Sequence, residues 1–254
     1  MIKLKTEEDI AILREGGRRL AKILGTVARE VKVGVETRAL DDLAEKLILA
    51  GGDKPAFLHY KPAGSRLAYP ASLCVSINEE IVHGLPSLRK IVDGDVVSLD
   101  LGLVHNGLYT DMAVTVAVGK IGELKQKMIE VAKEALSVGI KAARVGGHIG
   151  DISEAIENFV MKQGFAVVLD LAGHGVGFAA HEDPFIPNYG QKGKGVKIEE
   201  GLVIAIEPMV TIGDGRIKLE KDEFTFTTRN KEWCAHFEHT IAMTKKGPQI
   251  LTKL

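Results

Sequence analysis

The chain has 254 residues, of which 45% are hydrophobic and 26% are charged, and its formal net charge is −1. These values are typical of a globular protein with a substantial core in one or two domains, and they argue against a protein that binds nucleic acid through a basic surface. No apolar run approaches the roughly 20 residues that span a bilayer, and acids near the start do not suit a secretory signal, so we expect a cytoplasmic protein with reduced Cys74 and Cys234.

The first half of the chain is predicted to begin with two helices. Thr6 precedes three acids, which is typical of a helix N-cap, and apolar residues recur at helical spacing over residues 10 to 27. A second helix is expected to begin near Thr37 and to stop at the glycine pair 51–52. Strand-like runs follow to about residue 118.

The last two of these runs, 96–105 and 108–118, are expected to form an antiparallel hairpin. The pair Asn106-Gly107 between them suits a type I′ turn, because both residues accept positive φ. Such a turn makes Asp100 the diagonal neighbour of Asp111, on one face of the hairpin.

The surroundings of these two acids suggest why they are there. The same face carries mostly apolar residues, so we favour a buried face over the alternative of a solvated one. Buried carboxylates must be neutralised, and a divalent cation is the simplest partner.

The second half repeats this order of elements. Helices are predicted at about 123–143 and 151–163, and strands around 165–172, 202–212, 216–228 and 234–244. Residues 33–52 align with 145–164 at an offset of 112, which indicates an internal repeat. Two αβ halves, roughly 1–118 and 119–254, would place a functional site where their sheets meet.

Three segments of the second half each place a potential metal ligand in or beside an apolar run: His174 in LAGHGVG, Glu207 in VIAIEPM and Glu238 in HFEHTIAM. Singly, each has an ordinary explanation as a loop residue or an acid on a wet strand edge. Together with Asp100 and Asp111 they form a set of four carboxylates and one imidazole, which can hold two divalent ions with two carboxylates bridging. A structural zinc site would favour Cys and His, whereas this set suits a hydrolytic metal pair.

With these motifs, the chain resembles the type I methionine aminopeptidases over essentially its whole length. The resemblance is carried by SLDLG and YTDMA in the hairpin, and by GHGVG, HEDP, IEPM, FEHT and IVHG. It implies the α+β class and the duplicated pita-bread fold, in which two αβ halves with pseudo-twofold symmetry surround a central antiparallel sheet. It also implies a single catalytic domain over residues 1–254, in the compact form found in bacteria and organelles.

The resemblance implies a metal role for five residues. Two divalent ions, drawn from Co, Mn, Fe and Zn, would be bridged by Asp111 and Glu238. Asp100 would complete the coordination of one ion, and His174 with Glu207 that of the other.

The resemblance also implies the reaction, which is removal of the initiator methionine when the second residue is small. Glu207 would shuttle the proton from the attacking water to the leaving amine. His181 would hydrogen-bond the scissile carbonyl, and His83 would contact the substrate backbone. Tyr69 and Phe224 would line the methionine pocket.

The methionine pocket departs from the pattern of the family. Tyr69 in LAYP matches it, but Ala180 stands where an aromatic residue is usual, and Phe224 where a tryptophan is usual. Phe178 is a candidate replacement for the missing aromatic ring. The segment 60–68 is longer than usual, so we expect a pocket that selects methionine less strictly.

Two other functions remain open at this point. One is a proline-directed peptidase of the same fold, and the other is a binding module descended from an enzyme, although such modules usually lack ligands that this chain has. The implied partners are the N-termini of nascent polypeptides, with the ribosome as a candidate place of contact. We expect a monomer without nucleic-acid specificity or membrane association.

Overall fold

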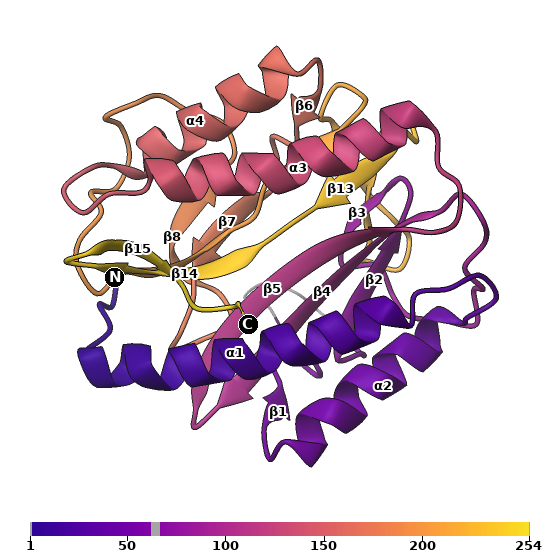
Figure 1. Cartoon of the computed structure of the whole chain (residues 1–254), viewed down its shortest axis with the longest axis horizontal. Coiled ribbons are helices and arrows are strands. Elements are labelled where there is room, and N and C mark those ends of the chain that lie inside the picture. Colours follow the sequence, from indigo (N-terminus) through magenta and orange to yellow (C-terminus); the bar gives the residue numbers. More distant parts are fainter. Residues whose placement is uncertain (1, 62–66, 254) are drawn as a thin grey trace.

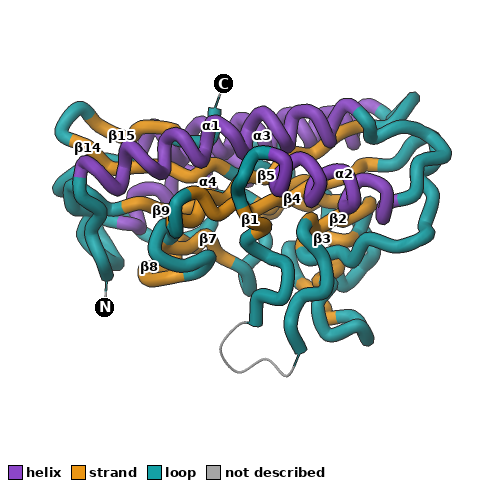
Figure 2. Tube along the Cα trace, turned by 90° about the horizontal axis from the view of Figure 1, so that it is seen from below, coloured by secondary structure: helices purple, strands orange, loops and turns teal. Residues whose placement is uncertain are grey.

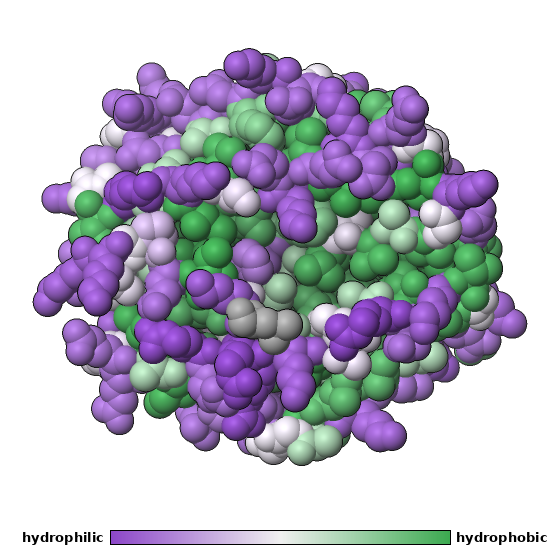
Figure 3. Space-filling view, in the orientation of Figure 1, coloured by the Kyte–Doolittle hydropathy of each residue, from purple (hydrophilic) through white to green (hydrophobic). Residues whose placement is uncertain are grey.

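A computed structural model describes residues 2–61 and 67–253 of the chain. The helices α1, α2 and α3 lie along one side of the strands, and many of the connecting loops lie on the other side (Figures 1 and 2). Hydrophilic side chains dominate the outline of the face in Figure 3, with apolar side chains between them. Within the described part, the helices lack the combination of length and hydropathy that a membrane-spanning segment needs.

The two predicted N-terminal helices are confirmed. Helix α1 (Glu7–Arg29) begins with a capping box, in which the Asp9 N–H donates to Thr6 Oγ1 at 3.1 Å and the Thr6 N–H donates to the Asp9 carboxylate at 2.9 Å. Helix α2 (Thr37–Ala50) ends at Gly51 as expected. Both helices bury their apolar stripes against the first-half strands.

The predicted hairpin and its register are also confirmed. Strands β4 (Val96–His105) and β5 (Leu108–Ala117) pair antiparallel, with Gly102 opposite Asp111. At the turn, Asn106 and Gly107 have φ of +48° and +82°, as a type I′ turn requires. Alternate leucines of β4 pack in the core formed with α1 and α2, so Asp100 faces the opposite side of the sheet.

The second half repeats the helical pair of the first as α3 (Glu123–Ala142) and α4 (Ile149–Lys162). The loops before α2 and α4 match in detail, because Gly34 and Gly146 have φ of +86° and +89°. The Gly34 N–H donates to the Ile91 carbonyl and the Gly146 N–H to the Ile198 carbonyl, each at 2.8 Å. The backbone therefore carries the same repeat that the sequence alignment indicated.

The strands are shorter and more numerous than predicted. The prediction of one strand over residues 165–172 was wrong, since only short strands form there. Each of the later predicted strands is divided into two shorter ones. At the break in the 202–212 run stands Pro208, which has no N–H for a sheet ladder. Strands β8 and β15 were not predicted. Beyond β4 and β5 the strands are β1 (Lys54–Pro55), β2 (Leu73–Ile77), β3 (Glu80–Val82), β6 (Ala166–Val167), β7 (Ala172–Gly175), β8 (Glu182–Pro187), β9 (Val203–Ile206), β10 (Met209–Thr211), β11 (Ile217–Leu219), β12 (Phe226–Thr228), β13 (Cys234–His236), β14 (His239–Thr244) and β15 (Gly247–Ile250).

The strands of the described residues form four antiparallel sheets. The first joins β1, β4 and β2 with β5 on β4, and another has the order β15-β14-β9-β7-β8; the remaining two are β13-β10-β6 and β11-β12-β3. The two halves meet where β5 runs beside the segment that joins β13 to β14. There the Glu238 N–H donates to the Ala113 carbonyl at 3.0 Å.

Threonine side chains complete this junction on either side. The Thr240 hydroxyl accepts from the Asp111 N–H at 2.9 Å and donates to the Asp111 carbonyl at 2.8 Å. The Thr115 hydroxyl makes the equivalent pair of bonds to the His236 backbone, at 2.9 and 2.8 Å. Two hydroxyls thus take the place of backbone ladder bonds, and Asp111 and Glu238 are brought together at the centre of the molecule.

Candidate metal centre and substrate pocket

One cavity of about 520 Å³ collects every site residue that the sequence predicted. Its lining includes five potential metal ligands, two histidines and two pocket aromatics, namely Asp100, Asp111, His174, Glu207, Glu238, His83, His181, Tyr69 and Phe224. The hairpin contributes the aspartates, while the second half contributes the ligands that follow them. The cavity therefore lies between the two halves.

Three buried carboxylates crowd the floor of this cavity. Burial is the largest effect on each, and it raises the pKa of Asp111 to about 6. The pKa values of Asp100 and Glu238 lie well above the usual range, because burial is reinforced by the charge of Asp111. Such a group of acids is stable in the ionised form only when a positive charge neutralises it.

His174 is oriented as a metal-ligating histidine would be. Its Nδ1 lies 2.9 Å from the Gly175 carbonyl oxygen, which can only accept, so Nδ1 carries the proton. Its Nε2 therefore presents a lone pair, 3.6 Å from Glu207 Oε1 and 4.0 Å from Asp111 Oδ2. An N–H bonded to a carbonyl on the far side of the ring is the usual arrangement behind a ligating imidazole.

The pattern of unsatisfied atoms fits a cation at this point. Among the described residues, five buried side-chain nitrogen or oxygen atoms have no hydrogen-bond partner, and four of these belong to Asp100, Glu238 and His236. Buried polar atoms are normally satisfied, so this concentration is unusual. Two donor sets, Asp111–His174–Glu238 and Glu207–His236–Glu238, each offer atoms within 4.8 Å of one another. The residues present thus fit divalent metal binding.

His236 is the residue that the sequence analysis missed. Its Nε2 lies 3.1 Å from Glu207 Oε2 and 3.9 Å from Glu238 Oε2, and the residue is 1% exposed. Two positions separate His236 from Glu238 in a strand-like run, and that spacing puts side chains on one face. This periodicity was the signal that could have found it.

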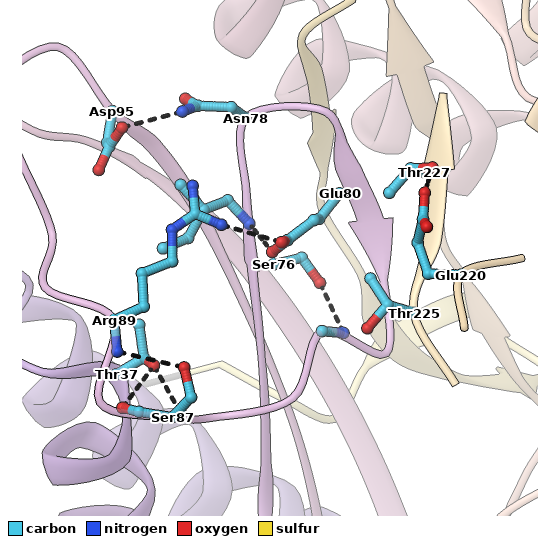
Figure 4. A network of polar contacts seen from close by, with 12 residues as sticks. Thr37, Ser76, Asn78, Glu80, Ser87, Arg89, Asp95, Glu220, Thr225 and Thr227 are labelled. Carbon is cyan, nitrogen blue, oxygen red and sulfur yellow. Dashed lines mark hydrogen bonds and ion pairs between the residues drawn. The ribbon is translucent and has the colours of Figure 1, made fainter. Parts of the chain in front are cut away.

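His83 lines the cavity, and polar contacts of Ser76, Glu80 and Arg89 lie near it in the chain (Figure 4). The residue has φ of +59°, and the next N–H, that of Gly84, donates to Ser76 Oγ at 3.1 Å. Arg89 pairs with Glu80 at 2.9 Å, which braces the same turn. Burial lowers the pKa of His83 to about 4, so the ring is uncharged at neutral pH.

His181 stands beside His174, with ring centroids 4.3 Å apart. Burial is the largest effect on His181, and it lowers the pKa of this residue to about 2. The ring of Tyr60 also packs against the ring of His181, with centroids 5.1 Å apart. Both histidines of the cavity wall can therefore act as uncharged hydrogen-bond donors.

The aromatic pocket contains both predicted residues. Tyr69 and Phe224 meet edge to face with centroids 5.5 Å apart, and the Tyr69 hydroxyl donates to the Gly84 carbonyl at 3.0 Å. Phe178 does not replace the missing aromatic ring, because it is 39% exposed and lies under Lys5 Nζ. Tyr60 does line the cavity. Part of the longer segment, residues 62–66, lies outside the described residues.

Comparisons with known proteins agree with this geometry. The sequence pattern of metallopeptidase family M24 matches residues 11–245. The chain is 45% identical to a methionine aminopeptidase of Aquifex aeolicus, over 100% of this chain and 99% of that protein. It is 42% identical to methionine aminopeptidase 1 of Bacillus subtilis, over the whole of both chains.

Solved structures show the same relationship. The crystal structure of methionine aminopeptidase from Rickettsia prowazekii superposes with a TM-score of 0.95 at 37% identity, and the match covers 100% of each chain. A prolidase from Pyrococcus furiosus is also similar, with a TM-score of 0.79 at 25% identity, over 99% of this chain and 65% of the prolidase. The expected α+β class and duplicated pita-bread fold are confirmed. The chain therefore belongs to the methionine aminopeptidase branch of metallopeptidase family M24.

Proposed function

We propose that this chain is a metal-dependent methionyl aminopeptidase, which removes the N-terminal methionine from polypeptides with a small second residue. The observation that carries the proposal is the convergence of five potential ligands from both halves on one cavity, with two uncharged histidines beside them. The membership of the chain in metallopeptidase family M24 indicates the class of reaction, which is hydrolysis of a peptide bond.

Five residues would hold two divalent ions in this proposal. Asp111 and Glu238 would be the central pair, with Asp100 on one side and with His174 and Glu207 on the other. When bound, the ions would polarise the scissile carbonyl and make a water molecule a stronger nucleophile at neutral pH. Mn, Fe, Co and Zn all suit these ligands, so availability would decide among them.

The side chains of the cavity would manage the proton and the developing charge. Glu207 would accept the proton of the attacking water and deliver it to the leaving amine. His181, which is uncharged at neutral pH, would donate a hydrogen bond to the carbonyl oxygen as negative charge develops there. His83 would hold the substrate backbone on the other side of the scissile bond.

The substrate side chain would occupy the apolar part of the cavity. Tyr69 and Phe224 form one wall, and Cys74 and Met209 also line the space. We further propose the N-termini of nascent polypeptides as substrates, the ribosome as a place of contact, a cytoplasmic location and a monomeric state. The assignment of residues 1–254 to one catalytic domain belongs to the same proposal.

A reconstitution experiment tests this function. Protein freed of metal by chelation is supplied with single divalent metals and assayed for release of Met from Met-Ala-Ser and of Xaa from Xaa-Pro peptides. We expect release of Met with at least one metal and little release from Xaa-Pro peptides. Preferential cleavage of Xaa-Pro peptides would instead identify a proline-directed peptidase, which the similarity to prolidase makes the relevant alternative. Metal binding without any cleavage would indicate a binding module.

A further inference from the structure

We propose that His236 is a positioning residue for Glu207, and that it acts by donating a hydrogen bond from Nε2 to Oε2 of the Glu207 carboxylate. This inference rests on the role given to Glu207 in the proposed function. It assigns a task to a buried imidazole that the expected ligand set does not include.

The two oxygens of Glu207 face different histidines. Oε1 lies 3.6 Å from Nε2 of His174, while Oε2 lies 3.1 Å from Nε2 of His236. The distance to His236 is within the range of an N–H···O hydrogen bond, but the ring is not turned into hydrogen-bond geometry. A rotation of the ring or the carboxylate is sufficient to form the bond.

The tautomer that best satisfies His236 is opposite to that of His174. His174 carries its proton on Nδ1, because that atom faces a carbonyl oxygen. Nδ1 of His236 has no acceptor among the described residues, so a proton there would be a buried and unsatisfied donor. A proton on Nε2 instead faces Oε2 of Glu207, and only a lone pair is left unpaired. The two imidazoles therefore suit different tasks, a ligand in His174 and a donor in His236.

The backbone of His236 is fixed tightly enough for this task. Its N–H donates to Thr115 Oγ1 at 2.9 Å, and its carbonyl accepts from the same hydroxyl at 2.8 Å. Ser98 Oγ lies a further 2.8 Å from Thr115 Oγ1 and supports that hydroxyl from the neighbouring strand. The backbone of Glu207 is held separately, because Asn188 Nδ2 donates to its carbonyl at 3.0 Å.

With both backbones held in this way, the Glu207 carboxylate can still rotate about the bonds of its side chain. A bond from His236 to Oε2 would remove this freedom and keep Oε1 directed at the ligand side of the cavity. Outer partners of metal-binding carboxylates typically change metal affinity or activity by about 10- to 100-fold when they are removed.

A matched pair of variants tests the proposal. The amide nitrogen of Gln reaches about as far as Nε2 of histidine, whereas that of Asn reaches only about as far as Nδ1. His236→Gln should therefore keep kcat for Met-Ala-Ser within a few-fold of the parent protein. His236→Asn should lower kcat by about 10- to 100-fold, with little change in KM. Thermal unfolding of both variants checks that each is folded.

A second readout does not depend on activity. Calorimetric titration of the chelated proteins with Mn²⁺ should show that the first ion binds normally to His236→Gln and about tenfold more weakly to His236→Asn. Equal impairment of the two variants, or two variants that both behave like the parent, would overturn the proposal. Loss of a nitrogen signal in pulsed EPR of the bound metal in His236→Gln would instead make His236 a ligand. Failure of the parent protein to release Met would refute the proposed function alone, since the titration still decides this inference.

Discussion

At the scale of single residues, the buried acids of the cavity dominate the behaviour of the protein. Burial and mutual repulsion raise the pKa values of Asp100 and Glu238 well above their usual range. An acid with a raised pKa in the folded state favours folding most at low pH, and this contribution is lost as the pH rises through the folded-state value. The cavity should therefore make metal-free protein sensitive to alkali.

We predict that the chelated protein becomes less stable between about pH 8 and pH 9.5. In this window the buried histidines contribute no slope, because their ordinary pKa of 6.5 is lowered further by burial and they are uncharged in both states. Thermal unfolding at several pH values measures the effect, and Glu238→Gln, which removes one acid, should flatten the dependence. Binding of a divalent metal should also remove the pH dependence of stability. Stability of the chelated protein that rises over this window would contradict the assigned shifts.

A second prediction concerns Glu207. Glu207→Gln keeps the shape of the side chain but cannot accept the proton of the attacking water, so kcat should fall by about 10²- to 10⁴-fold. The KM for Met-Ala-Ser should change much less. Steady-state kinetics on the metal-loaded variant measure kcat and KM. A near-normal kcat would show that Glu207 does not transfer the proton.

A third prediction tests the central position of Asp111. Its carboxylate is proposed to serve both ions and that of Asp100 only one, so Asp111→Ala should weaken the binding of both ions. Asp100→Ala should chiefly weaken the binding of one. Metal analysis after dialysis distinguishes the two patterns. Two tightly held ions per chain in Asp111→Ala would show that the carboxylate does not bridge.

At the scale of elements, an arm at the start of the chain is tied to the segment that carries His181. Lys5 forms an ion pair with Glu182, donates to the Lys3 carbonyl at 3.1 Å, and has a side chain that is only 1% exposed. The Lys5 N–H also donates to the Gly201 carbonyl at 2.7 Å. Burial lowers the pKa of Lys5, and Glu182 opposes that shift. The pair therefore joins the arm to the start of β8, directly after His181.

We predict that Lys5→Met destabilises the fold by about 3 kcal/mol, because Glu182 loses its partner in a mostly buried position. The double variant Lys5→Met, Glu182→Met should recover much of this loss, since no unpaired charge remains. Urea unfolding of the two variants and the parent measures both effects. A double variant as unstable as the single one would show that packing of the lysine, rather than its charge, matters.

At the scale of the whole molecule, the substrate pocket combines parts that lie far apart in the chain. Tyr69 and Tyr60 come from the segment before β2, whereas Phe224 and His181 come from the second half. Ala180, where an aromatic residue is usual, is buried and is not part of the cavity lining. Tyr60 supplies an aromatic ring next to His181 instead.

We therefore predict a graded preference for the first residue of the substrate. Met peptides should be cleaved best, and norleucine and Leu peptides at a detectable fraction of that rate. Tyr60→Ala should relax the preference further, because each lost methylene-sized contact is worth about 1 kcal/mol of discrimination. This prediction is tested by measuring kcat/KM for the three peptides with the parent protein and with Tyr60→Ala. Tyr60→Phe is the control, because it keeps the aromatic ring. Unchanged selectivity in Tyr60→Ala would exclude Tyr60 from the pocket.

Local signals in the sequence determined the features that depend on neighbouring residues. The Asn106-Gly107 turn sets the hairpin register, because positive φ at both positions leaves one two-residue connection, and that register places Asp100 and Asp111 on one face. The capping box at Thr6 likewise marks the start of α1. The ligand motifs could be recognised for the same reason, since each is a short run with its own pattern.

Contacts between segments that are distant in the chain become visible only in the folded protein. The approach of His236 to Glu207, the packing of Tyr60 on His181, and the threonine bonds from Thr240 to Asp111 have no local signature. The short strands of the second half were also missed, because single apolar runs cannot show where a chain leaves a sheet. These features depend on how the two halves pack, and packing depends on the shape and hydrogen-bonding capacity of surfaces that the linear order does not bring together.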